Sequence, residues 1–456
     1  MSKTQLPNSG TMACLTTAQD LSSIQTPTFE KSSRAGSTQL PNPAGRAAQK
    51  GFVFALAALA LLLQCSTMIA VAFAIVSLTV FYWNMCCRPR LVVGMKVASI
   101  VAKLGALHRR LNITPWAMVS HVQCTLFIIW PLMSYKGRRA IHFQREMLQL
   151  RDGDVALDWI CVDGASPPAA DHRGVIVLQL PGIVGKYSNK YLCRFAQYSG
   201  FPCVVKSWRG IGCDLSSARP ETWDPHAVKD TLEVGTYLRG AYPHAKLIIM
   251  GWSHGGNVAL CALAQGQHLF DAGILVSAPS DLSVAIPAVE QVRFPYAYVN
   301  TFGIYQNISQ EVNRQVITRA DPLMDERLKV AKDAMKLGNL LTHVFWARQP
   351  FGFTYHDLVT RRYTKHDSVP DYYQSLGDMV EYAMPRVAVP TLCLFAEDDP
   401  VTPICSFSKY LHLASAYMAF AVTPKGGHCG WFCGLKGLSW INEVACEFCE
   451  AVRECR

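Results

Sequence analysis

An apolar run that leads into a serine between glycines is the feature of this sequence that most restricts its fold. Residues 247–250 are apolar and predict a buried strand, Gly-Trp-Ser-His-Gly follows at 251–255, and the small residues of 256–263 predict a helix. A strand that turns sharply into a helix with Ser253 at the apex has the geometry of a nucleophile elbow. The alternative interpretation is an ordinary glycine-rich turn, and the rest of the sequence decides between the two.

Apolar runs separated by helix-length segments predict an α/β fold. Because a helix fits between most neighbouring runs, we expect the strands to form a mostly parallel central sheet flanked by helices. The interval 282–385 interrupts this alternation with aromatic residues and several helical patterns, which predicts an inserted helical cap over the site. The predicted strands lie at 174–180, 201–206, 246–250, 273–277, 390–395 and 419–422.

Acidic residues follow the serine at the end of a predicted strand. The sequence Glu-Asp-Asp-Pro occupies 397–400, so its carboxylates lie at the carboxyl end of a strand, where catalytic groups gather in α/β sheets. We select Asp399 as the partner of a histidine because a proline follows it directly. Asp398 is the alternative, and whichever carboxylate is not the partner is expected to be solvated or to stabilise the turn.

Two histidines lie beyond these acids. His412 falls in a helical pattern, which predicts a structural role, whereas His428 lies in a glycine-rich loop after a predicted strand. From such a loop an imidazole can reach both Asp399 and Ser253. A neutral imidazole can accept the serine proton, while the carboxylate fixes its tautomer and stabilises the imidazolium. The order Ser253, Asp399, His428 is the order of a hydrolase-type triad on an α/β sheet.

An oxyanion hole requires two backbone donors near the nucleophile. His254 supplies the first by its position directly after Ser253, and its side chain is expected to pack against the elbow. The loop 180–185 follows an earlier strand, and we expect the second donor to be the N–H of Ile183. The alternative is that this loop only ends the strand and supplies no donor.

The N-terminal part of the sequence predicts a tail and a membrane segment. Residues 1–50 are rich in Ser, Thr, Gln, Pro and Gly without hydrophobic periodicity, so they predict disorder. Residues 51–87 contain no charged side chain and predict a transmembrane segment. One helix over this segment would be about 55 Å long against a hydrocarbon core of about 30 Å. We favour one span with interfacial overhang over two short spans that meet near 64–67, because no Pro or Gly marks a hairpin there.

The remaining boundaries follow from this segment. Residues 88–136 are expected to form a juxtamembrane or interfacial region, and 137–456 the catalytic domain. Basic residues balance on the two sides of the segment, so no orientation follows from them. We expect a single-pass membrane protein, with the endoplasmic reticulum as one candidate location.

Composition limits the partners. The net charge of +10 comes from 43 Lys and Arg against 33 Asp and Glu, without a dense basic block or aromatic-interleaved repeat, so no nucleic-acid partner is expected. A moderate basic excess fits a surface that faces anionic lipid. The 17 cysteines show no repeated zinc-ligand spacing, so no metal is expected. No particular protein partner is indicated.

Several motifs accompany Ser253, Asp399 and His428 over about 158–451: Pro181-Gly182-Ile183 with Tyr191, Trp208-Arg209-Gly210, Tyr242-Pro243, Tyr372-Tyr373 and Asp398-Asp399-Pro400. Together they resemble α/β-hydrolase family 4, the membrane-anchored abhydrolase-domain proteins and related esterases. The resemblance implies the α/β-hydrolase fold, a triad of Ser253, Asp399 and His428, hydrolysis of carboxylic esters that include acylglycerols and phospholipids, and no cofactor. His254 departs from the larger aliphatic residue usual after the serine, and Trp208 departs from the residue usual before Arg-Gly.

The sequence therefore predicts a membrane-anchored serine hydrolase that cleaves esters, with lipid acyl esters as the expected substrates, through an acyl-Ser253 intermediate. A thioesterase or acyltransferase would use the same three residues. A noncatalytic scaffold that retains the fold for protein binding is the alternative from another class.

Overall fold

A computed structural model provides the three-dimensional structure of the chain. The residues it describes are 67–86, 88–129, 140–182, 190–215, 228–278, 281–290, 313–320, 323, 325, 326, 329 and 366–455.

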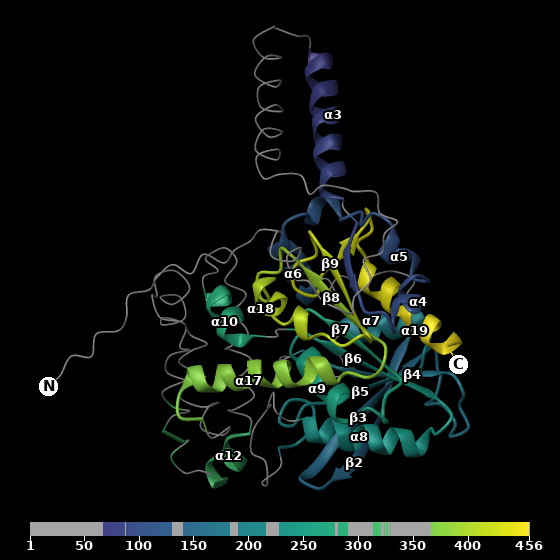
Figure 1. The fold of residues 1–456 in the computed structure, drawn as a ribbon, viewed down its shortest axis with the longest axis vertical. Helices are drawn as coiled ribbons and strands as arrows, with labels where there is room; N and C mark the ends of the chain where they lie inside the picture. The colour runs from purple at the N-terminus through teal and green to yellow at the C-terminus, as the bar shows by residue number, and fades with distance from the viewer. Residues whose placement is uncertain are drawn as a thin grey trace, which may run out of the picture.

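A nine-stranded sheet forms the centre of the described chain (Figure 1), in the order β1-β9-β8-β7-β6-β4-β5-β3-β2. The six strands β4 to β9 pair in parallel. These six coincide with the strands predicted from apolar runs, which confirms the mostly parallel sheet. They are β4 (Val175–Leu180), β5 (Cys203–Lys206), β6 (Lys246–Trp252), β7 (Ala272–Val276), β8 (Thr391–Ala396) and β9 (Met418–Thr423).

Three further strands extend the sheet at its two edges. β2 (Ile141–Leu150) and β3 (Gly153–Val162) form an antiparallel hairpin beside β5, and β1 (Arg90–Val93) pairs antiparallel with β9. The globular domain therefore begins at Arg90, earlier than the expected start near Gly137. The reason is that the apolar side chains that follow β1 are buried in the core, among them Val97, Ile100 and Leu104.

Helices cover both faces of the sheet, so both faces of its central strands are buried. On β6, Leu247 and Ile249 pack in one core with α8 (Val228–Ala241) and α9 (His254–Gln265). Ile248 and Met250 point to the other face and pack with α7 (Lys190–Ser199) and α19 (Trp440–Glu454). Burial on both faces explains why these strands are continuous apolar runs rather than alternating ones.

Shorter elements complete the described chain. The small antiparallel pair of β10 and β11 lies apart from the main sheet. The remaining elements are α3 (Thr67–Met85), α4 (Ala98–Val101), α5 (Gly105–His108), η1 (Pro115–Ala117), α6 (Ser120–Ile129), α10 (Leu282–Glu290), α12 (Arg314–Ala320), α17 (Val369–Ala383), η5 (Met384–Arg386), α18 (Cys405–Ser408), η6 (Leu411–Leu413), β10 (Phe432–Cys433) and β11 (Leu438–Ser439).

The predicted tail and the first part of the predicted membrane segment, residues 1–66, lie outside the described residues. The rest of that segment forms α3, which rises from one end of the domain (Figure 1). Among the described residues, no helix combines the length and the apolar character needed to cross a bilayer.

The predicted cap interval 282–385 is described only in part. Its last helix, α17, packs against α9 and so belongs to the helical layer beside the sheet, and α10 packs against α17. Most of the sequence between α10 and α17 lies outside the described residues, so a cap over the site stays a prediction.

Candidate active site

Ser253 stands at a sharp turn between β6 and α9. Its backbone has φ +50° and ψ −121°, a left-handed region that a residue with a side chain adopts only when the surrounding structure enforces it. Its N–H donates to the carbonyl of Val276 (2.7 Å) and its carbonyl accepts from the N–H of Gly256 (2.8 Å). A Cβ on Gly255 would lie 2.6 Å from the carbonyl oxygen of Pro181, so this position requires glycine. The close approach of β4 to the elbow therefore explains why residue 255 is a glycine.

The loop after β9 brings His428 to this serine. The Nε2 atom of His428 lies 2.8 Å from the Oγ atom of Ser253, and the histidine is 7% exposed. Gly427 and Cys429 flank it with φ of 59° and 60°. With a residue in this conformation on each side of it, His428 lies in a tight loop that brings its imidazole to the elbow.

Asp399 holds the other side of the imidazole. Its Oδ2 atom lies 2.9 Å from the Nδ1 atom of His428. Its Oδ1 atom accepts the backbone N–H groups of Val401 and Thr402, both at 2.8 Å. The carboxylate is therefore fixed by the turn that follows it. This arrangement makes Nδ1 the protonated nitrogen and leaves Nε2 as an acceptor for the hydroxyl proton of Ser253.

Burial and charge act in opposite directions on the pKa of His428. Burial is the largest single effect and lowers the pKa, because the protonated ring loses its hydration. The negative charge of Asp399 raises it. Together with the hydrogen bond that the ring donates to this carboxylate and the influence of Cys429, this charge leaves the pKa of His428 well above its ordinary value. Asp399 thus stabilises the imidazolium that proton transfer from Ser253 would form.

Asp398 has a different position. Its Oδ1 atom accepts the N–H groups of Gly426 and Gly427, each at 2.9 Å, so it anchors the loop that carries His428. Burial raises its pKa, opposed by these hydrogen bonds. Of the two adjacent acids, the structure places Asp399 against His428 and Asp398 beneath its loop. His412, the other histidine considered, lies in η6 and is exposed.

The Pro181–Gly182 loop approaches the serine from the end of β4. A Cβ on Gly182 would lie 3.6 Å from the Cβ of Ser253. The indole N–H of Trp208 donates to the carbonyls of Pro181 and Gly182, both at 3.2 Å, and the N–H of Gly182 donates to the hydroxyl of Tyr191 at 3.0 Å. The loop is therefore held from two sides. Ile183, the predicted second oxyanion donor, lies outside the described residues.

His254 is the first residue of α9, and its ring lies 5.5 Å from that of Trp208. The first N–H groups of a helix have no acceptor in a preceding turn, which suits the predicted role of the His254 backbone as an oxyanion donor. Its side chain thus contacts Trp208, in the loop after β5, while packing against the elbow itself stays a prediction.

Helix α6 supports the histidine loop through contacts that the sequence alone did not indicate. The backbone N–H of His428 donates to the Sγ atom of Cys124 at 3.0 Å. The side-chain oxygen of Gln123 accepts the N–H of Phe432 at 2.8 Å. The two residues of each pair are about 300 positions apart in the sequence, so no local motif predicts these contacts.

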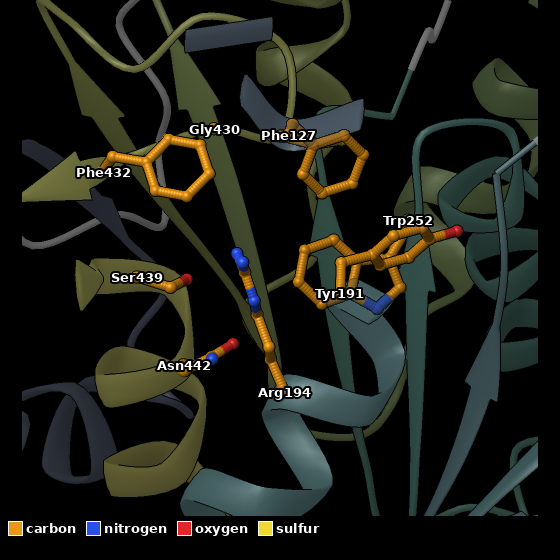
Figure 2. A pocket seen from close by; sticks show the side chains of 9 residues that line it. Phe127, Tyr191, Arg194, Trp252, Gly430, Phe432, Ser439 and Asn442 are labelled. Atoms are coloured by element: carbon orange, nitrogen blue, oxygen red, sulfur yellow. The ribbon is translucent and has the colours of Figure 1, made fainter. Parts of the chain in front are cut away.

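A small pocket lies directly behind the site, between α6, α7, α19 and the loop after His428 (Figure 2). Phe127, Tyr191 and Trp252 form one wall, with ring centroids 4.6 to 6.2 Å apart. Figure 2 shows Arg194 reaching up from α7 between this wall and Phe432. Because Trp252 precedes Ser253 in the chain, the aromatic wall supports the elbow from the side opposite the helix α9.

Comparison with known proteins identifies the family of the chain. The family model of the alpha/beta hydrolase fold matches residues 175–432, more than half of the chain. The human protein ABHD15 is 26% identical over 352 residues, which cover 74% of this chain and 68% of the relative. Monoacylglycerol lipase ABHD2 of Danio rerio is 22% identical, with 68% and 70% covered, and the human phospholipase ABHD3 is 22% identical, with 69% and 73% covered. The chain belongs to the alpha/beta hydrolase fold family, as one of its abhydrolase-domain proteins.

Proposed function

We propose that this protein is a serine hydrolase that cleaves carboxylic esters, with Ser253, His428 and Asp399 as its catalytic triad. The observation that carries the proposal is one continuous hydrogen-bonded chain. It runs from the Ser253 hydroxyl through both nitrogens of His428 to the carboxylate of Asp399, at 2.8 and 2.9 Å. Family membership and the names of the lipase relatives support the same reaction class.

The first half of the reaction forms an acyl-enzyme. The Oγ atom of Ser253 attacks the ester carbonyl carbon as its proton passes to the Nε2 atom of His428. The tetrahedral intermediate collapses, the carbon–oxygen bond to the alcohol breaks, and His428 returns the proton to the departing alkoxide. Asp399 remains ionised throughout and offsets the charge of the imidazolium.

The second half releases the acid. A water molecule gives its proton to His428 and attacks the acyl carbon, and the bond to Ser253 then breaks as His428 reprotonates the serine oxygen. The negative charge on the carbonyl oxygen would be stabilised in both halves by the backbone N–H of His254 and by that of Ile183. No metal or organic cofactor enters any step.

We propose that the esters are acyl esters of lipids and that the chain acts at a membrane. ABHD2 and ABHD3 are named as a monoacylglycerol lipase and a phospholipase. The apolar sequence 51–87 has no charged side chain, and large apolar side chains of α3 such as Ile75 and Leu78 are exposed. Exposed apolar surface of this extent is stabilised by a lipid environment. We propose single-pass attachment through residues 51–87, with the endoplasmic reticulum as a candidate membrane.

The test is a lipid-class profile. Full-length protein and its Ser253→Ala variant are incubated with vesicles that contain monoacylglycerol, diacylglycerol, phosphatidylcholine and phosphatidylethanolamine, and the released fatty acids are measured by mass spectrometry. We expect release from at least one class by the wild type and none by the variant. Equal profiles for the two proteins would refute the proposal, and acyl transfer to an added short alcohol in preference to water would identify an acyltransferase instead.

A further inference from the structure

We propose that a second surface of the domain, separate from the apolar segment, docks onto an anionic lipid bilayer. This docking face consists of Trp116, Val119, Leu435 and Leu438, with Lys436 between the two leucines. The proposal rests on the membrane attachment proposed above and adds the part of the folded domain that contacts the lipid.

Hydrogen bonds unite two segments that are distant in the sequence into the docking face. The N–H of Thr114 donates to the carbonyl of Phe432 at 3.0 Å, and its hydroxyl donates to that of Gly434 at 2.8 Å. The indole N–H of Trp116 lies 3.4 Å from the carbonyl of Leu435. The segment 114–119, which contains η1 and leads into α6, therefore forms one surface with the β10–β11 hairpin.

The apolar side chains of this surface are directed outward. Trp116 and Val119 are 48% and 49% exposed, and Leu435 and Leu438 are 79% and 64% exposed. Scattered exposed apolar residues are normal, but four large ones on two adjoining segments form a patch of the kind that marks an interaction site. Tryptophan is also a preferred residue at the level of lipid headgroups.

The docking face continues directly from the base of α3. The hydroxyl of Tyr82, near the end of α3, donates to the carbonyl of Ile113 at 2.8 Å. Arg110 donates to the carbonyl of Cys86 at 3.0 Å and lies 4.8 Å above the ring of Trp83, which is itself exposed. Figure 1 shows α3 rising from the end of the domain where α6 lies. A lipid environment around α3 would therefore extend onto the docking face.

Charge distinguishes a bilayer from a protein partner. Between Lys31 and Arg145 the sequence contains no Asp or Glu, and ten Lys and Arg fall between 88 and 145. Some of these pair with carboxylates elsewhere, such as Arg109 with Glu443. Lys436 is exposed within the docking face, and Arg88 is exposed shortly after the end of α3. A second copy of this chain would bring basic surface against basic surface, whereas anionic headgroups complement it.

The docking face is also linked to the proposed catalytic base. The same helix α6 that begins beside Trp116 carries Gln123 and Cys124, which hold Phe432 and the backbone of His428. Phe432 is the first residue of β10, the strand that leads to Leu435. Contact with the bilayer would thus be made by the two elements that support the histidine loop.

The test uses the full-length protein in nanodiscs. The double variant Leu435→Asp/Leu438→Asp places charge in the docking face, and Met147→Asp is the matched control. Met147 is 53% exposed and lies on β2. This strand is at one edge of the sheet, and β1, the strand that follows α3, is at the other. Hydrogen–deuterium exchange of peptides that cover 113–122 and 432–439 is measured in discs of phosphatidylcholine with phosphatidylserine, in pure phosphatidylcholine discs and in detergent micelles.

We expect the wild type and Met147→Asp to exchange at least fivefold more slowly in these peptides in anionic discs than in micelles. Pure phosphatidylcholine should give an intermediate rate, and the double variant should lose the protection. Equal exchange in discs and micelles would overturn the proposal. So would protection that depends on protein concentration rather than lipid, which would indicate a second copy as the occupant.

Activity gives a separate reading. Turnover of a long-chain ester embedded in the bilayer should fall at least tenfold in the double variant, while turnover of water-soluble p-nitrophenyl butyrate stays within twofold. Wild type that hydrolyses neither ester would refute the proposed hydrolase function without affecting the exchange result. An equal loss on both esters would contradict the docking role, because it would show damage to the site itself.

Discussion

Replacement of Asp399 by asparagine tests the assignment of the triad acid through its hydrogen bonds. The Oδ1 atom of Asp399 accepts from the N–H groups of Val401 and Thr402, so the amide oxygen of asparagine must occupy that position. The amide NH₂ group then faces the Nδ1 atom of His428 where Oδ2 was, 2.9 Å away. A donor in that place forces the imidazole into the tautomer with its proton on Nε2. That tautomer cannot accept the proton of Ser253.

The expected loss follows from this wrong tautomer. The corresponding Asp→Asn change in a serine protease lowers kcat about ten thousandfold, which is about 5.5 kcal/mol of transition-state stabilisation. We expect a loss of the same order here. The assay is kcat/KM for p-nitrophenyl butyrate with purified full-length protein, together with thermal unfolding to verify that the variant is folded.

Asp398→Asn is the matched control, because the two acids are neighbours in the sequence. Its amide oxygen can still accept the N–H groups of Gly426 and Gly427, and the contact it loses is a partly exposed one with Lys425 at 3.5 Å. Partly exposed ion pairs contribute about 0–1 kcal/mol, so we expect less than about a tenfold loss. If Asp398→Asn abolished activity and Asp399→Asn retained it within tenfold, the assignment would be wrong.

Three other perturbations have definite outcomes. Because His428 must be neutral to act as a base and its pKa is raised, kcat/KM should fall as the pH drops through a midpoint above about 6.5. Asp399→Asn removes the negative charge that raises this pKa, so its residual activity should have a midpoint at lower pH, and an upward shift would contradict this. Gly255→Ala forces a Cβ into a carbonyl oxygen at the end of β4, so we expect a destabilisation of about 1–3 kcal/mol or more in chemical denaturation, and unchanged stability would contradict the tight elbow. Trp208→Phe keeps an aromatic ring but removes the donor to the Pro181–Gly182 loop, which should lower the free energy of unfolding by about 1–3 kcal/mol. We expect kcat to fall tenfold or more with little change in KM. A change in KM alone would argue against a role for Trp208 in positioning that loop.

The parts of the fold that were predictable are those with a local signal. The six parallel strands are apolar on both faces, and Ser253 lies between glycines that the turn requires. His428 was selected because few histidines follow the acids and because it lies in a glycine-rich loop, in which Gly427 has a positive φ.

The parts that were not predictable depend on contacts between distant segments. β1 pairs with β9, more than 300 positions away, so its four residues have no recognisable local pattern. β2 lies at an edge of the sheet and mixes polar with apolar side chains, so its sequence does not distinguish it from a loop. Trp208 was noted only as part of a family motif, Trp208-Arg209-Gly210, in which it replaces the usual residue. Its contact with the Pro181–Gly182 loop exists only once β4 and β5 lie side by side.

The most direct measurement of the central claim is covalent labelling of the serine. Full-length protein is treated with an alkyl fluorophosphonate at neutral pH, and the modified residue is located by peptide mass spectrometry. The account predicts a single phosphonylated residue, Ser253, with labelling lost in Ser253→Ala and slowed at least a hundredfold in His428→Ala. An unlabelled wild type, or a label on a different residue that persists in Ser253→Ala, would contradict it.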